Sequence, residues 1–486
     1  MKKTSFFLLV LSTVFFSHDS FAQQKWTVLE CVRYAQEHNI SVKRADVQRR
    51  VAEVTYKQNR YSSFPNANFN TSTGYQFGRS IDPTTNLFTN QQLVYQNLNL
   101  NADIMIFNWG RIKNGIISAD LEAQASVQDV ERNKNDIAIS VATAYLQILL
   151  NQEQVRIFEV TVEQTVSQLK DTRKRVDAGA IPELNAVTLE SQLALDSSTL
   201  VTAKSNVELS KLQLQALMNI DMSIPFDIET PSVDNIPLES IADLQPDIVY
   251  KLALTNQPAQ KANDLRYQSL VASVKSIKGS LYPRITGFGG LSTRFSNPNK
   301  KISSGSITGY SPGPSIVVVG PNTYPVQIPN VQLTTDKVGF GDQWSGWGTQ
   351  INNFFSQNIG LSINVPIFNG YSARSNYERA KLNIKDADLV IEQANQTLQQ
   401  NIYTAYANAM AALEKFNAAK SGVVSSQKAY DFSKKRYDLG LLTTFELITA
   451  QNNLAKSKID VTNSRFDFVF KMKVLEFYKG SGIKLN

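Results

Sequence analysis

Two stretches of the chain repeat one another and decide its architecture. Residues 96–108 read QNLNLNADIMIFN, and residues 357–369, 261 positions later, read QNIGLSINVPIFN. The same offset relates Arg175-Val176-Asp177-Ala178-Gly179 to Arg436-Tyr437-Asp438-Leu439-Gly440, with no insertion or deletion between the two matches. We therefore interpret the chain as a tandem duplication in which each half is one structural unit.

A second offset supports the same interpretation. Ser63-Phe64-Pro65 matches Leu281-Tyr282-Pro283, and His38-Asn39 matches Asn256-Gln257, both 218 positions later. The two offsets differ by 43 residues, which we assign to extra length in one loop of the second half.

The first 22 residues have the pattern of a cleaved secretory signal. Met1-Lys2-Lys3 precedes an apolar run from Phe6 to Phe16, and Ser20-Phe21-Ala22 ends the segment. The apolar run is too short for a membrane-spanning helix, which needs about 20 apolar residues. Glu30 directly precedes the single cysteine, Cys31, and argues against a lipoprotein acylation site.

The composition excludes several classes of function. The formal net charge is +7, and the basic residues alternate with acidic ones along helical stretches, which is typical of solvated helix faces rather than a nucleic-acid site. Beyond the predicted signal only one histidine remains, His38, and no phosphate-binding loop, dinucleotide fingerprint or nucleophile elbow is present. We predict no enzyme activity, no cofactor and no metal site.

Two unusually long helices are predicted, one in each half. No glycine or proline occurs from Ile116 to Ala178, a length that would span roughly 95 Å as a helix. Average helices contain about 11 to 12 residues. Apolar or aromatic residues recur every seven positions and predict coiled-coil packing. They are Val141, Ile148, Val155, Val162, Leu169 and Val176, with the counterparts Ile402, Ala409, Phe416, Val423, Tyr430 and Tyr437.

Each long helix is predicted to end at a turn and to return. Gly179 and Gly440 stand where left-handed helix caps are favourable, and Pro182 stands where a new helix can begin. The return helices are predicted over Glu183–Asn219 and Leu441–Lys479. Each half therefore contains a long helical hairpin with its tip at the glycine.

Four segments alternate between apolar and polar residues with a period of two. They are Ala67–Gly78, Val94–Ile106, Ile285–Phe295 and Phe355–Ile367. Their length suits transmembrane β-strands of about 9–11 residues. The polar set Asn97, Asn99, Asn101 and Asp103 is expected to face a pore. Because the smallest barrels have about eight strands and open edges are not tolerated in lipid, the chain must combine its strands with those of other copies.

The domain organisation follows from these elements. We expect a first repeat over residues 23–220, a proline-containing linker over 221–246, a second repeat over 247–480 and a short tail over 481–486. The second repeat contains a long polar loop, residues 296–348, which is either a variable surface loop or a plug or receptor surface.

The order of these elements resembles the TolC-type outer-membrane efflux proteins. Leu29–Phe64 and Leu252–Tyr282 are similar to the leading helix of each repeat in that family. The resemblance implies a homotrimer with a twelve-stranded barrel in the outer membrane of a Gram-negative bacterium and a helical tunnel in the periplasm. It also implies an exit duct that passively conducts substrates from an inner-membrane pump and a periplasmic adaptor.

The resemblance also implies a gate at the periplasmic tip. Tyr437 and Glu446 match the family's gate positions in residue type, whereas Leu442 replaces a basic residue and Thr449 replaces an acidic one. Asn185 takes the place of the equivalent acid in the first hairpin. Three copies of Glu446 near one axis would repel one another and attract cations. Glu446 could equally be a solvent-facing glutamate, and Tyr437 a packing residue of the seven-residue stripe.

The hairpin tips are the expected adaptor contacts in this family. The residues concerned are Gly179, Ala180, Ile181, Gly440, Leu441 and Leu442. A rival interpretation is a periplasmic coiled-coil adaptor or scaffold, which would have no use for four alternating strands. Within the duct interpretation, drug, metal and protein export all remain open.

Overall fold

The computed structural model describes residues 25–81, 86, 88, 89, 92–230, 236–298 and 300–480. The predicted signal peptide and the C-terminal tail lie outside these residues. The described residues fall into two compact units, one drawn from residues 1–56, 117–271 and 381–486, the other from residues 57–116 and 272–380.

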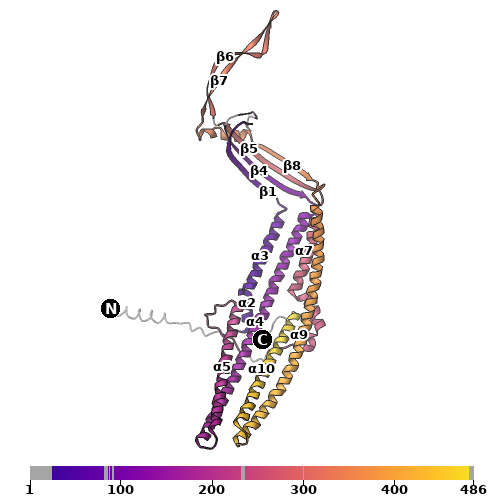
Figure 1. Cartoon of the computed structure of the whole chain (residues 1–486). Helices are drawn as coiled ribbons and strands as arrows, with labels where there is room; N and C mark the ends of the chain where they lie inside the picture. Colours follow the sequence, from indigo (N-terminus) through magenta and orange to yellow (C-terminus); the bar gives the residue numbers. More distant parts are fainter. Residues whose placement is uncertain are drawn as a thin grey trace, which may run out of the picture. The chain divides into compact units, whose positions relative to one another are not determined.

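The helices occur as pairs of copies. The first half contains α2 (Val28–His38), α3 (Ile40–Tyr61), α4 (Arg111–Asp177) and α5 (Glu183–Met218). The second half contains α6 (Pro246–Asn256), α7 (Pro258–Gly279), α9 (Ser372–Asp438) and α10 (Thr444–Lys479). Helices α4 and α5 form one long hairpin, and α9 and α10 form another (Figure 1).

The helix ends confirm the tandem duplication to the residue. Both ends of α4 and α5 recur in α9 and α10 at the offset of 261, and both ends of α2 and α3 recur in α6 and α7 at the offset of 218. The predicted seven-residue stripe is buried or half-buried at every position, from Val141 to Val176 and from Ile402 to Tyr437. The long helices α4 and α9 therefore pack through the face that carries the seven-residue stripe, as the sequence pattern predicts.

The leading helix of each half is broken in two, although the sequence pattern predicts one continuous helix. The breaks lie at Asn39 and Gln257, which have extended backbone conformations, and the second precedes a proline that disfavours the helical region. Asn39 Nδ2 donates to the carbonyl oxygen of Leu217, and Gln257 Nε2 donates to that of Tyr478. Each side chain therefore satisfies a carbonyl at the end of the return helix, where no helical partner exists.

The linker between the repeats is fastened to the helical unit. Trp26 pairs with the fully buried Ile228 as an isolated parallel bridge. The buried pair Lys473 and Glu476 holds the later part: Lys473 Nζ donates to Pro237 O at 2.6 Å, and the Glu239 amide donates to Glu476 Oε1 at 3.0 Å. A buried pair of this kind is costly unless its hydrogen bonds are made, and here both partners have them.

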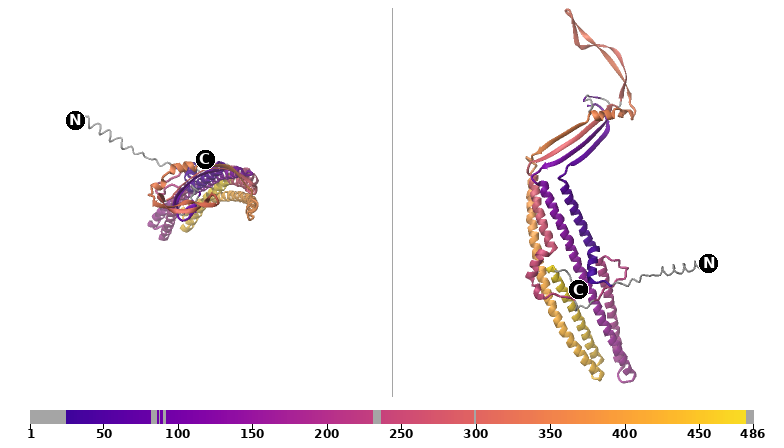
Figure 2. Two further views of the ribbon diagram at one scale, coloured as in Figure 1. Left: turned by 90° about the horizontal axis from the view of Figure 1, so that it is seen from above. Right: turned by 180° about the vertical axis from the view of Figure 1, so that it is seen from behind.

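The second unit contains a four-stranded antiparallel sheet in the order β1-β4-β5-β8 (Figure 2). Its strands are β1 (Asn66–Gln76), β4 (Leu93–Phe107), β5 (Arg284–Pro298) and β8 (Ser356–Asn364). All four predicted strands are confirmed. Strand β8 ends before the predicted Ile367 because Pro366 cannot donate a backbone hydrogen bond to a neighbouring strand.

The region expected as a loop differs from the prediction. Residues 296–348 contain the end of β5, a hairpin of β6 (Lys300–Val319) and β7 (Asn322–Lys337), and a short 3-10 turn, η3 (Asp342–Trp344). The helix α8 (Trp347–Asn353) follows. Strands β6 and β7 accommodate Pro312, Pro314, Pro325 and Pro329 because a two-stranded ribbon has free outer edges, where the missing N–H of proline costs nothing.

Candidate functional site

The two hairpin tips are built in the same way. Gly179 has φ +69° and Gly440 has φ +75°, in the left-handed region that favours glycine. The Gly179 amide donates to Val176 O and the Ala180 amide to Arg175 O, and the same two bonds recur from Gly440 to Tyr437 O and from Leu441 to Arg436 O. This pair of bonds is the Schellman motif, which satisfies the last carbonyls of a helix.

The return helices begin differently. Helix α5 starts after Pro182 without a side-chain cap, whereas α10 starts with a capping box. The Glu446 amide donates to Thr443 Oγ1 at 3.3 Å, and the Thr443 amide donates to Glu446 Oε2 at 2.9 Å. The predicted gate residue Glu446 therefore also has a structural function at the start of α10.

The capping box sets the electrostatics of Glu446. Hydrogen bonds from the backbone and then the side chain of Thr443 lower the pKa of Glu446 below its usual value. Because the pKa is lowered in the folded chain, the cap is fully stabilising at neutral pH and is lost as the pH falls through that lowered pKa. Within one chain the pKa of Glu446 is therefore lowered, whereas repulsion among three copies of the carboxylate would raise it.

Tyr437 connects the two hairpins. Its hydroxyl lies 3.0 Å from Thr172 Oγ1 on α4, and the Arg175 guanidinium lies 5.9 Å from the centre of its ring. Thr172 is buried, so its hydroxyl has little access to water. Tyr430 lies one seven-residue repeat before Tyr437, and Gln168 Nε2 donates to its hydroxyl at 3.2 Å. No sequence pattern indicates that Thr172 or Gln168 contacts these tyrosines.

A further contact joins the return helices. Thr444 Oγ1 donates to Asn185 Oδ1 at 2.9 Å, which links α10 to α5. Asn185 occupies the position that corresponds to Glu446 at the offset of 261, so the two halves use equivalent positions differently. Leu442, which replaces a basic residue of the family, instead packs beside Tyr430, Tyr437 and Leu447.

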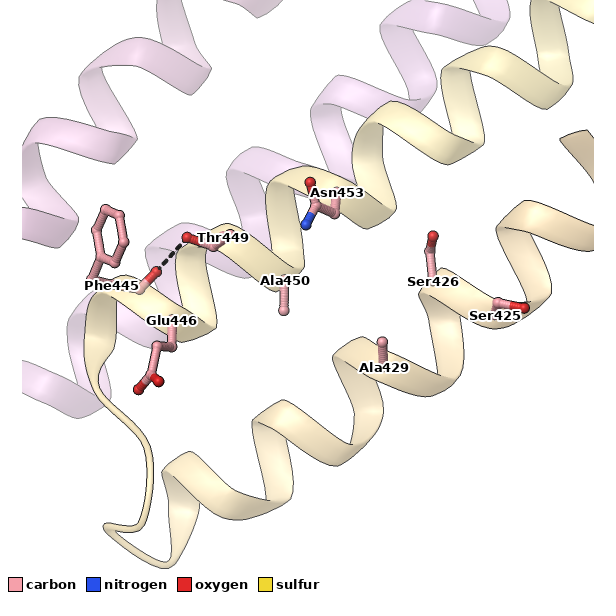
Figure 3. Close-up of a pocket in the computed structure, with 8 residues that line it drawn as sticks. All are labelled: Ser425, Ser426, Ala429, Phe445, Glu446, Thr449, Ala450 and Asn453. Carbon is pink, nitrogen blue, oxygen red and sulfur yellow. Dashed lines mark hydrogen bonds between the residues drawn. The ribbon is translucent and has the colours of Figure 1, made fainter.

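A groove of about 490 Å³ lies between α9 and α10 near the tip (Figure 3). Two of its small residues, Ala429 and Ala450, correspond at the offset of 261 to Gln168 and Leu189 in the first hairpin. Leu189 is fully buried there. Replacement of large side chains by alanine therefore explains the groove. Its lining residues are Ser425, Ser426, Ala429, Phe445, Glu446, Thr449, Ala450 and Asn453.

The predicted pore residues share one face of the sheet. Asn97, Asn99, Asn101 and Asp103 pair across β1 with Ser72, Asn70, Asn68 and Asn66. Directly opposite residues of an antiparallel pair point to the same side, so this face is polar across both strands. The other face carries Phe69, Leu100, Leu291, Ile359, Leu361 and Ile363, which are all exposed. These four polar residues belong to the second unit, and all of the tip residues belong to the first.

Among the residues that the structure describes, no group of three or more His, Cys, Asp or Glu side chains could hold a metal ion. None of the helices in that part of the chain is long and apolar enough to cross a membrane.

Comparison with known proteins agrees with this geometry. The chain is 20% identical over 379 residues to the toxin and drug export protein A of Aggregatibacter actinomycetemcomitans, covering 76% of this chain and 69% of the relative. Its fold is similar to that of CusC, with a TM-score of 0.72 at 15% identity over 93% of this chain and 91% of that one. The outer membrane protein VceC of Vibrio cholerae gives a TM-score of 0.67 at 15% identity, over 94% and 97% of the two chains.

The profile of one protein family, described as outer membrane efflux protein, matches residues 32–219 and 327–466. These segments contain the whole of the first helical hairpin, all of α9 and most of α10. The chain therefore belongs to the outer membrane efflux protein family and is an outer-membrane channel that serves as the exit duct of an efflux system.

Proposed function

We propose that three copies of the chain close one twelve-stranded barrel in the outer membrane, after residues 1–22 have directed export and been removed. The observation that carries this proposal is the open sheet: among the residues that the structure describes, β1 and β8 each pair on one side only. Adjacent strands in the order β1-β4-β5-β8 are antiparallel, so β8 of one copy can pair with β1 of the next in the same antiparallel manner.

The two faces of the sheet support this arrangement. The apolar face has large exposed side chains, including Ile359 at 93% and Leu361 at 69% exposure, which would be unfavourable in water. In the barrel this face contacts lipid, and the polar face with Asn97, Asn99, Asn101 and Asp103 lines the pore. Two copies would reach the minimum of about eight strands. The number three rests on the family.

In this proposal the helical units of three copies form a periplasmic tunnel that an inner-membrane pump supplies through an adaptor. The adaptor meets the tips at the exposed residues Gly179, Ala180, Gly440 and Leu441 and at the half-buried Ile181. Leu442, half-buried against Tyr437, supports the tip rather than facing the adaptor. The relative named for toxin and drug export makes such compounds the first substrates to test.

The gate in this proposal is the set of neutral contacts that hold the second hairpin against the first. Tyr437 is the central contact, because it joins α9 to α4 at Thr172. Release of this contact would let α9 and α10 move away from α4 and widen the tunnel at its tip.

Replacement of Tyr437 by phenylalanine tests the gate. A neutral hydrogen bond contributes about 0.5–1.5 kcal/mol, so we expect Tyr437→Phe to favour the open state about two- to twelve-fold. The measurement is the open probability of single channels in planar bilayers. Thr172→Val should give the same change, and the double variant no more than either. If the changes in open probability of the two single variants add up in the double variant, or if the open probability does not change, the contact is not a gate.

Replacement of Glu446 by glutamine tests the pore position. Glutamine preserves the capping box, so the variant removes the charge and leaves the helix start intact. We expect a loss of cation preference in reversal-potential measurements, and in the wild type the same loss as the pH falls through the lowered pKa of Glu446. Glu414→Gln, at an exposed site on α9, is the matched control. Equal selectivity of wild type and Glu446→Gln would place Glu446 away from the pore.

Replacement of Leu441 by glutamate tests the adaptor contact. Leu441 is 65% exposed, whereas any side chain at Gly440 would strain the cap and confuse the result. We expect Leu441→Glu to abolish export in cells and crosslinking to the adaptor while the trimer still assembles. Val424→Glu, at a site 52% exposed on α9, should export normally. Export by Leu441→Glu at the wild-type rate would refute this contact.

A further inference from the structure

Residues 339–355 form a small structure against the sheet. The segment contains η3 and α8 and lies between β7 and β8. Trp344 stacks on the fully buried Phe295, with ring centres 5.3 Å apart and planes at 13°. The Tyr75 hydroxyl donates to Gln343 Oε1 at 2.8 Å.

Further hydrogen bonds hold the segment on three strands. Trp347 Nε1 donates to Gln96 Oε1 at 2.6 Å, and Thr293 Oγ1 donates to Ile351 O at 2.6 Å. With Tyr75, these contacts reach β1, β4 and β5. The segment is thus fixed to the sheet rather than being a free loop.

Most of the side chains that the segment contacts belong to the apolar face, among them Tyr75, Gln96, Thr293 and Phe295. At the end of the segment, Phe354 also lies against Arg294, which shares the other face with Asn97. Gln96 pairs with Phe295, and two residues further along each strand Leu98 pairs with Thr293. Even-numbered residues of β4 and odd-numbered residues of β5 therefore share the face that carries Leu100 and Leu291. The segment covers the face that is directed to lipid in the proposed barrel.

The segment lies near one end of the expected lipid-contacting band. The ten residue-to-residue steps from Ile285 to Phe295 span roughly 34 Å along β5, or about 26 Å across the membrane at a tilt of about 40°. The apolar band of outer-membrane barrels is about 25 Å tall. Phe295, under η3, therefore coincides with one rim of the band, while Leu291 and the residues toward Ile285 remain uncovered by the segment.

The outer surface of the segment is aromatic and nearly uncharged. Phe340 is 70% exposed, Phe355 is 52% and Trp347 is 40%. Asp342 is the only charged residue from 339 to 355. Tryptophan and other aromatic side chains favour the membrane–water interface, where short amphipathic segments lie in the plane of the head groups.

We propose that residues 339–355 are an interfacial anchor, with Phe340, Trp347 and Phe355 inserted among the lipid head groups at the rim of the barrel where β5 ends. This inference rests on the proposed orientation of the sheet. It assigns a membrane-binding surface to the segment between β7 and β8. The anchor fixes the depth of the barrel by adding a lipid contact outside its wall.

Spin labelling tests the anchor. Cys31 is the single cysteine of the chain, so a Cys31→Ala background allows one nitroxide at a time. The label is placed at Phe340→Cys or Phe355→Cys in nanodiscs of palmitoyl-oleoyl phosphatidylcholine. Collision rates with oxygen, which prefers lipid, and with a water-soluble nickel chelate give the depth. Leu361→Cys is the lipid reference and Ala180→Cys, at a hairpin tip, is the water reference.

We expect an oxygen-to-nickel ratio at positions 340 and 355 that is several-fold above that at 180 and below that at 361. A ratio equal to that at 180 would overturn the anchor. Low collision rates with both reagents would also overturn it, because they would place the segment against another copy of the chain. If the oxygen-to-nickel ratio at position 361 equals that at position 180, the apolar face of the sheet does not face lipid, and the proposed anchor is refuted as well.

Discussion

The unpaired edges of the four-stranded sheet are the constraint on which the rest of the molecule depends. Strands β1 and β8 each have one edge that pairs with no other strand in the described part of the chain, and an open edge is not tolerated in the hydrocarbon of a bilayer. The exposed apolar face adds a second cost in water. Edge-to-edge joining of identical sheets removes the first cost, and contact of the closed barrel with lipid removes the second. The duplication supplies two strands per repeat and one long hairpin per repeat, so assembly of the barrel brings the hairpins together as well.

Three hydrogen bonds between the hairpins have a common chemical character. Gln168 with Tyr430, Thr172 with Tyr437 and Thr444 with Asn185 are all neutral hydrogen-bonding pairs. Such pairs carry no formal charge and are little affected by salt, in contrast to ion pairs at a surface. A gate built from them responds to mechanical displacement by a partner more than to a change in salt concentration. The charge of Glu446, held by its capping box, then affects which ions pass rather than whether the gate is closed.

Much of the fold could be predicted from the sequence because the duplication tests every element twice. The glycines at 179 and 440 and the period-two strands gave the right elements, with helix ends within a few residues. The breaks at Asn39 and Gln257 were missed because their cause lies elsewhere, in carbonyls at the ends of α5 and α10. The β6–β7 hairpin was missed because its prolines resemble loop signals. At the site, Tyr437 was named as a gate candidate from its position three residues before Gly440. Its partner Thr172 is 265 residues away, and no local pattern connects the two. The groove between α9 and α10 arises from alanines, which carry no signal when read alone.

Closure of the sheet only with other copies of the chain can be tested by native mass spectrometry of the detergent-solubilised protein, which counts the chains in a particle without a label or a substitution. We expect a particle of three chains, with no folded single chain at equilibrium. A stable, folded single chain in the micelle would refute closure by assembly, because its sheet would then tolerate open edges.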